Sequence, residues 1–248
     1  MKIRAIILSA LILCGISAVI MYSRAAQPQQ KSSVITQAIN DKNTPMVIKN
    51  LILKMKEQME VNDDQFPELI KEVENYTNSL ADSASVAVLH SMLAEMYQNY
   101  YQRNQWTINQ RTQLSGYIPE DIRVWTSNLF TDKIKEEIDL SLRPTALLQN
   151  TPVSKFKDIL EIGKDSQTLR PTLYEFLAFR ALDIQPTVQI YKDLIAFQNK
   201  EPNMKSVLLT ELDYLRFLYG DKRDKESFEA YMNALDELYK IGRASCRE

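Results

Sequence analysis

Glycine is scarce in this sequence, at five residues in 248, or about 2% against a usual share of about 7%. Folds with many tight turns use glycine where the backbone needs a positive φ angle, so the scarcity disfavours turn-rich β architectures. Along the body of the chain, Gly116, Gly163 and Gly220 stand isolated from one another. Their isolation excludes the glycine-rich phosphate loops of nucleotide-binding proteins.

Cysteine and histidine are nearly absent as well. Cys14 and Cys246 lie at the two ends of the chain, and His90 is the single histidine. One histidine without nearby cysteines cannot complete a closed zinc site or activate a nucleophile. We therefore expect His90 to be a packed, hydrogen-bonded ring beside an apolar stripe. The body has no cysteine for disulfide bonds, so its stability rests on packing.

The acidic residues form no recognisable catalytic pair. Glu136 and Glu137 are adjacent, so their side chains should point to different sides of a helix and not converge as an acid-base pair. The same holds for Glu72 and Glu74. Carboxylates from separate helices could still meet, as glycosidases require, but solvated charges are the usual outcome. We therefore predict that the protein is not an enzyme and has no catalytic, cofactor-binding or metal-binding residues.

Charge of one sign is also missing. The 30 basic and 32 acidic residues leave a net charge of −2, and the two signs are interspersed along the chain instead of collecting in blocks. Without a positive region to attract phosphates, we expect no binding of nucleic acid.

The first 25 residues have the pattern of an export signal. Lys2 and Arg4 precede an apolar run from residue 5 to 21, and a cleavage site with small residues follows at Ala25. The run is close to the roughly 18 residues that can span a bilayer, so an uncleaved membrane anchor is the alternative. We predict a signal peptide or anchor helix over residues 1–25, a polar linker over 26–35, and an exported protein.

Apolar residues then recur at helical spacing from residue 36 to 240, without any run of strand-like alternation. We predict an all-α domain of antiparallel helical hairpins. It should form an irregular α-solenoid similar to tetratricopeptide arrays, although no strict period of about 34 residues fits. If the domain divides, its boundary falls near Gln185 and Pro186.

The predicted helices have identifiable start signals. Pro45 suits the first position of one helix, whose apolar stripe includes Met46, and Thr172 with Glu175 forms a capping box before the most apolar helix. The helices are expected over residues 44–60, 66–80, 83–101 or beyond, 118–142, 151–163, 170–183, 187–200, 203–220 and 225–240.

The stretch "MYQNYYQRNQW", residues 96–106, gathers three tyrosines and a tryptophan. Met96, Tyr97 and Tyr100 continue the helical stripe of the leucines before them, whereas Trp106 falls nearly opposite it. A base-stacking platform needs exposed rings in a positive groove, but Glu95 and neutral amides surround these rings. We expect a packed helix face whose tyrosine hydroxyls bind asparagine and glutamine side chains.

Four arginines stand beside aromatic residues: Arg103, Arg111, Arg170 and Arg180. A guanidinium group can stack on a ring or bind several carbonyl oxygens at once. We expect these side chains to tie helix ends together and not to contact a ligand.

The last eight residues, "IGRASCRE", resemble the translation of a sequencing adapter. We predict that residues 241–248 are a non-native tail. The alternative is a natural, frayed helix end with Gly242 as its stop signal.

Three segments resemble the amino-terminal helical region of bacterial alpha-2-macroglobulin-family proteins. They are "YYQRNQWTINQRT" (100–112), "EDIRVWTSNLF" (120–130) and "RPTLYEFLAFRALD" (170–183), and the resemblance covers residues 36 to 238. It implies a longer exported protein of the gram-negative envelope or periplasm, in which helices precede β-sandwich domains, a protease-cleaved bait segment and, in many members, a Cys-Gly-Glu-Gln thioester. No bait or thioester motif occurs in this sequence, so none of the functional residues of that family maps onto it.

The resemblance implies a non-catalytic portion of a protease trap. Its partners would be the other domains of the parent protein and, through them, the trapped proteases, with membrane anchoring through the amino-terminal segment. The alternative is a free-standing helical repeat scaffold or glycan-binding protein of the bacterial envelope. The native sequence beyond Lys240 separates the two hypotheses.

Overall fold

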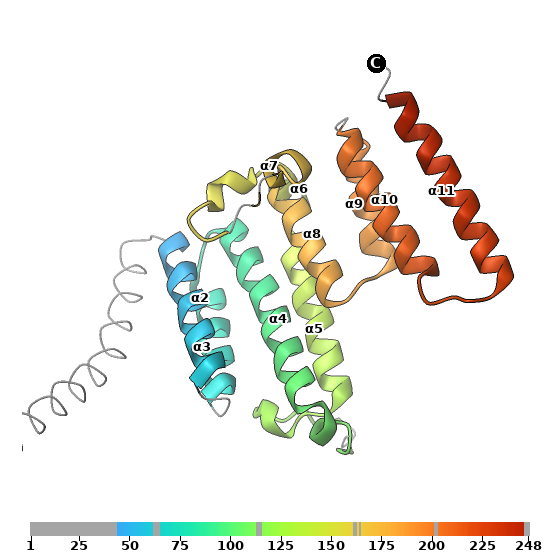
Figure 1. The fold of residues 1–248 in the computed structure, drawn as a ribbon. Helices are drawn as coiled ribbons and strands as arrows, with labels where there is room; N and C mark the ends of the chain where they lie inside the picture. Colours follow the sequence, from blue (N-terminus) through green and yellow to red (C-terminus); the bar gives the residue numbers. More distant parts are fainter. Residues whose placement is uncertain are drawn as a thin grey trace, which may run out of the picture.

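The computed structural model describes residues 44–61, 65–112, 116–160, 163, 165–200 and 203–245. Within these residues the chain is all helical, without strands, and the predicted fold class is confirmed (Figure 1). The predictions for residues 1–25 and 26–35, and for the end of the tail, lie outside the described residues. The longer helices are α2 (Thr44–Val61), α3 (Phe66–Ser79), α4 (Ser83–Ile108), α5 (Ser127–Leu142), α8 (Leu173–Ile184), α9 (Val188–Gln198), α10 (Met204–Tyr219) and α11 (Lys225–Ser245).

Short helical turns connect the long helices. They are the 3₁₀ turns η2 (Ile122–Val124) and η3 (Val153–Phe156), and the single-turn helices α6 (Thr145–Gln149) and α7 (Ser166–Leu169). No described helix is both long enough and apolar enough to cross a membrane.

The core is built around α4, which packs against α3, α5 and α8 and also contacts α2. In Figure 1 these helices form a bundle at the amino-terminal end of the molecule. One contiguous apolar cluster fills the bundle. Its largest fully buried side chains are Phe66, Phe130, Phe156, Tyr97, Met96, Ile48, Ile70, Leu51, Leu69, Leu89 and Leu93.

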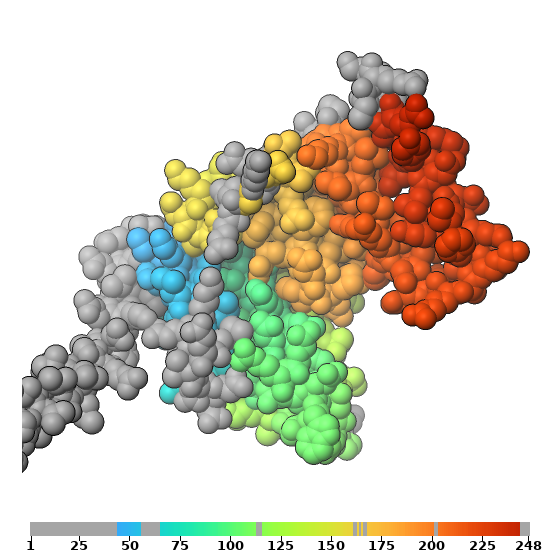
Figure 2. Space-filling view, viewed as in Figure 1, coloured from blue at the N-terminus to red at the C-terminus, as the bar shows by residue number. Residues whose placement is uncertain are grey.

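The carboxyl-terminal helices extend this bundle as a single row. α9 packs against α8, α10 against α9, and α11 against α10 (Figure 1). In Figure 2 the red surface of α11 forms one end of the molecule. Across the proposed boundary at Gln185, the rings of Tyr174 on α8 and Phe197 on α9 meet edge to face at 5.2 Å. The boundary itself stays a prediction.

The capping box at the start of α8 is confirmed. Thr172 accepts a hydrogen bond from the Glu175 backbone, and the Glu175 carboxylate accepts one from the Thr172 backbone. Seven of the twelve residues of α8 are buried. Such a box satisfies amide groups at the helix start that would otherwise lack partners.

The prediction of one helix over residues 118–142 is wrong at its start. α5 begins only at Ser127, after a 3₁₀ turn and an extended Trp125. The Trp125 indole donates to the carbonyl of Pro119 at 2.7 Å, and Arg111 donates to the carbonyl of Trp125 at 2.7 Å. These contacts hold the segment in a loop that places Trp125 against the core.

The expected helix over residues 151–163 is also wrong. Residues 153–156 form a 3₁₀ turn, because the backbone at its amino-terminal end pairs with the start of α8. The amide of Val153 donates to the carbonyl of Pro171, and that of Leu173 donates to Thr151. On α2, Met46 is 41% exposed, and Val47 takes the buried position beside Ile48.

Candidate functional site

The aromatic stretch in α4 is a packed face, as the spacing predicts. Tyr97 is buried and stacks on Trp125, with ring centroids 5.6 Å apart, and the Phe130 ring lies 5.3 Å from that of Trp125. Trp106 is 79% exposed, on the side away from this cluster. The rings of Tyr97 and Tyr100 therefore pack in or against the core and do not form an exposed surface for base stacking.

The partners of the tyrosine hydroxyls are only partly as expected. Tyr101 donates to Asn109 Oδ1 at 3.1 Å, which agrees with the predicted amide partners. The Tyr97 hydroxyl instead donates to the carboxylate of Glu74 on α3, at 2.7 Å. A buried phenol next to a carboxylate points to a polar cluster among α3, α4 and α5.

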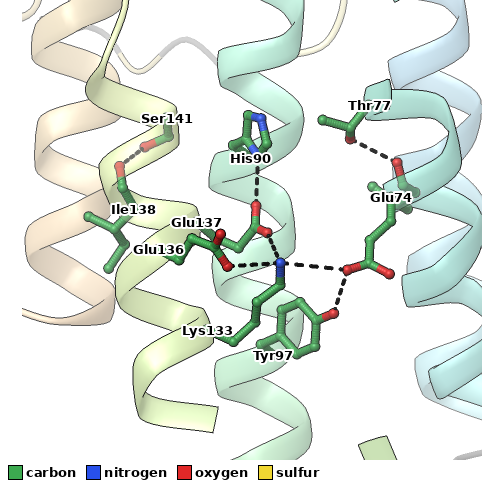
Figure 3. Close-up of polar contacts among 10 residues, drawn as sticks. Glu74, Thr77, His90, Tyr97, Lys133, Glu136, Glu137, Ile138 and Ser141 are labelled. Carbon is green, nitrogen blue, oxygen red and sulfur yellow. Dashed lines mark hydrogen bonds and ion pairs between the residues drawn. The ribbon is translucent and has the colours of Figure 1, made fainter. Parts of the chain in front are cut away.

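Lys133 of α5 is the centre of that cluster (Figure 3). Its ammonium group lies 2.8 Å from Glu137 Oε1, 3.1 Å from Glu136 Oε2 and 3.9 Å from Glu74 Oε1. The prediction that Glu136 and Glu137 diverge is therefore wrong, because both reach back toward the same residue, three and four positions earlier on the helix. Glu72 and Glu74 do have different partners, since Glu72 pairs with Lys54.

His90 completes the cluster from α4. Its Nδ1 atom lies 2.6 Å from Glu137 Oε2, and the ring is largely buried. An ionised carboxylate only accepts hydrogen bonds, so the His90 Nδ1 carries the proton and donates it. The expectation of a packed, hydrogen-bonded histidine is confirmed.

The charges in the cluster reinforce one another. Burial by itself would raise the pKa of Glu137, but hydrogen bonds from His90 and Lys133 outweigh it and hold that pKa below its usual value. Burial likewise opposes the charge on Lys133, yet the bond to Glu137 leaves the Lys133 pKa raised. Burial and the nearby Glu74 raise the pKa of the Tyr97 phenol far above its ordinary value.

These pKa shifts bear on what the cluster can do chemically. A general acid or base works best with a pKa near the working pH, whereas the shifts of Glu137, Lys133 and Tyr97 all lead away from neutrality. Each group holds its charge or proton and binds its neighbour. The arrangement is that of a structural tie between three helices.

Arg180 and Arg111 tie separate elements together, as predicted, and Arg170 stacks on a ring of α8. Arg180 of α8 donates to Ser91 Oγ at 2.9 Å and pairs with Glu95 at 2.6 Å, both on α4. Arg111 holds the loop before α5, and the Arg170 guanidinium stacks 3.8 Å from the centroid of the Phe179 ring. Arg103 lies on the exposed side of α4.

Open apolar surface lies on α10 and α11, where the sequence predicts no site. One groove of about 530 Å³ runs over Tyr214 and Leu215 of α10, between α9 and α11. A second, of about 640 Å³, lies on the other side of α10 and is lined by Leu208, Leu212 and Leu235. Tyr239, which also lines this groove, is 62% exposed, and Phe228 near the start of α11 is 60% exposed.

A sequence signal for this surface did exist. The side chains of Phe228, Met232, Leu235 and Tyr239 recur at steps of four, three and four, which adds a second apolar stripe to α11 beside the one that packs on α10.

Among the described residues, no group of three or more histidine, cysteine, aspartate or glutamate side chains is placed to hold a metal ion. Comparisons with protein-family models, with curated proteins and with solved structures return no match.

Proposed function

We propose that this chain is a non-catalytic helical docking module, the amino-terminal helical portion of an exported alpha-2-macroglobulin-like protease inhibitor. The observation that carries the docking role is the apolar surface of α10 and α11, with its two open grooves. Large exposed apolar patches on otherwise soluble folds mark sites of protein interaction.

The partner of this surface is a further domain of the parent protein. Each helix from α9 onward buries its apolar side on the helix before it, and α11 has apolar residues left over on its outer side. Phe228, Met232 and Tyr239 precede residue 241, so these exposed side chains do not depend on the origin of the tail. The two grooves do include tail residues, with Ile241 in the first and Gly242 and Arg243 in the second. A domain of the parent protein that packed on this surface would remove these side chains from water.

The identity of the parent rests on the resemblance of residues 100–112, 120–130 and 170–183 to the macroglobulin family. In that role the parent traps proteases in the periplasm or at the envelope, and this portion positions its other domains. Export rests on the pattern of residues 1–25.

Thiol labelling tests the docking role. Met232→Cys, in a background with Cys14→Ser and Cys246→Ser, carries a single thiol on the exposed stripe of α11. We expect rapid reaction with a maleimide in the present chain and slow reaction in the parent protein. Asn233→Cys, on the polar side of α11, is the matched control and should react equally in both. Equal rates for Met232→Cys in both proteins would refute docking at this surface.

The native gene beyond Lys240 tests the parent. Alternating strands with sandwich spacing, together with protease inhibition by the full-length product, support a macroglobulin. A stop codon or further helical repeats would instead support the free-standing scaffold.

A further inference from the structure

Two small pockets with polar linings lie next to each other where α6, α8 and α9 meet. The inner pocket, of about 300 Å³, is lined by Asn150, Glu175, Gln198 and Asn203 among others. The outer pocket, of about 290 Å³, includes Tyr174, Asp193 and Lys200. Gln149 and Phe197 line both pockets, so the two are direct neighbours, and together they are here called the polar groove.

The polar groove contains hydrogen-bonding atoms that the fold leaves unused. Gln198 is 2% exposed, and its Oε1 is the single buried side-chain polar atom without a hydrogen-bond partner among the described residues. Its Nε2 donates to Glu175 Oε1 at 3.2 Å, which sets the orientation of the amide, because a flipped amide would put two acceptors together. A buried acceptor without a partner costs free energy, and a donor that reached Oε1 from the inner pocket, which Gln198 lines, would recover it.

Other amides of the inner pocket are also available. Asn150 uses its Nδ2 to bind the carbonyl of Ala146, which leaves Oδ1 for another donor. Gln149 lies between the two pockets, and its side chain makes no hydrogen bond to another described residue. The inner pocket therefore offers the Oδ1 atom of Asn150 and the Oε1 atom of Gln198 as acceptors, and Gln149 offers a complete amide between the two pockets.

The charges of the groove disfavour an anionic ligand. The inner pocket has the carboxylate of Glu175 and no basic residue in its described lining. In the outer pocket, Asp193 accompanies the single Lys200. A phosphate, sulfate or carboxylate would meet like charge without a compensating guanidinium fork.

Two rings supply the apolar part of the groove. Phe197 lines both pockets and meets Tyr174 edge to face, with the ring planes at 82°. The C–H face of a sugar ring packs on such an aromatic surface, while its hydroxyl groups both donate and accept hydrogen bonds, as amides do. A volume of about 300 Å³ per pocket lies at the small end of ligand sites.

We propose that the polar groove binds a neutral carbohydrate, with one sugar unit in each pocket and the linkage between them at Gln149 and Phe197. An N-acetylated sugar suits the inner pocket best, because its amide N–H adds a donor for the free acceptors there. This binding does not depend on the macroglobulin assignment. The polar groove shares no residue with the stripe on α11, although its outer pocket and the first apolar groove share Ala196.

Calorimetric titration of the full chain with N-acetylglucosamine and with its disaccharide chitobiose tests the proposal. Glucuronic acid, a sugar of similar size with a carboxylate, is the charge control. We expect millimolar or tighter binding of N-acetylglucosamine, tighter binding of chitobiose because it occupies both pockets, and at least about tenfold weaker binding of glucuronic acid. No heat with either neutral sugar, or equal binding of glucuronic acid, overturns the proposal.

Variants assign the binding to the polar groove. Gln149→Ala should weaken the affinity for chitobiose about fivefold to tenfold, the effect of one lost hydrogen bond. Phe197→Leu, which keeps an apolar side chain but removes the ring, should weaken it similarly. Gln102→Ala, at an exposed position of α4, is the matched control, and this variant should bind chitobiose as the wild type does. Unchanged affinity in both groove variants, with thermal unfolding as in the wild type, places the sugar elsewhere and refutes the proposal.

Discussion

His90 on α4 donates a hydrogen bond to Glu137 on α5 across 2.6 Å, joining residues 47 positions apart in the chain. The other oxygen of the same carboxylate pairs with Lys133 at 2.8 Å. Glu137 is 2% exposed, so its charge has almost no access to water and depends on these two partners. Removing either partner should therefore cost more than an ordinary surface contact.

Lys133→Met should lower the free energy of unfolding by about 2–4 kcal/mol, because it leaves the buried carboxylate without its cation. Urea denaturation followed by circular dichroism measures the change. Lys135→Met, two positions away on the exposed side of α5, is the matched control and should change stability by less than about 0.5 kcal/mol. Equal effects of the two substitutions would show that the cluster contributes nothing specific.

Substitution of His90 tests the second partner of Glu137. His90→Leu should destabilise the fold by about 1–3 kcal/mol, since the carboxylate loses a donor in a buried place. His90→Gln, whose amide can donate to the same oxygen, should recover part of this loss. If leucine and glutamine at this position give the same stability, the hydrogen bond is not the cause of the effect.

The cluster should also shape the response to acid. The pKa of Glu137 in the folded state lies below its usual value near 4.5. Its contribution is therefore fully present above that value and is lost as the pH falls through the folded-state pKa. Urea denaturation between about pH 6 and pH 3 should show a steeper loss of stability in the wild type than in Glu137→Gln, which has no charge to lose. Parallel pH profiles would contradict the depressed pKa.

The two tryptophans should behave as opposites. Trp106→Phe should change the free energy of unfolding by less than about 0.5 kcal/mol, because this side chain is mostly in water. Trp125→Phe should cost about 1–3 kcal/mol, since it loses the bond to Pro119 and the full stack on Tyr97. Acrylamide should quench fluorescence strongly in Trp125→Phe and weakly in Trp106→Phe. A reversed order of quenching would mean that the helix face has been assigned wrongly.

Most of the fold could be predicted because its signals are local. The capping box at Thr172, the proline in the first turn of α3 and the apolar spacing through Tyr97 each act within a few residues. These signals identify the helices and the inward face of α4. They also place Trp106 outside the core.

The helix predictions are wrong where contacts between distant parts of the chain determine the local conformation. Residues 118–126 have helical spacing, but Arg111 and the ring of Tyr97 hold Trp125 in an extended conformation. The 3₁₀ turn at residues 153–156 depends on backbone pairing with the start of α8, which no local pattern announces. Likewise, the polar groove depends on α6, α8 and α9 coming together.

The order in which the helices pack also implies a gradient of local opening. α4 touches helices on several sides, whereas α11 packs chiefly on α10. Separating α11 therefore breaks one main interface and exposes little that is not already in contact with water. Its amide hydrogens should exchange with deuterium long before those of α4, so the chain should loosen from the α11 end inward instead of opening as one cooperative unit.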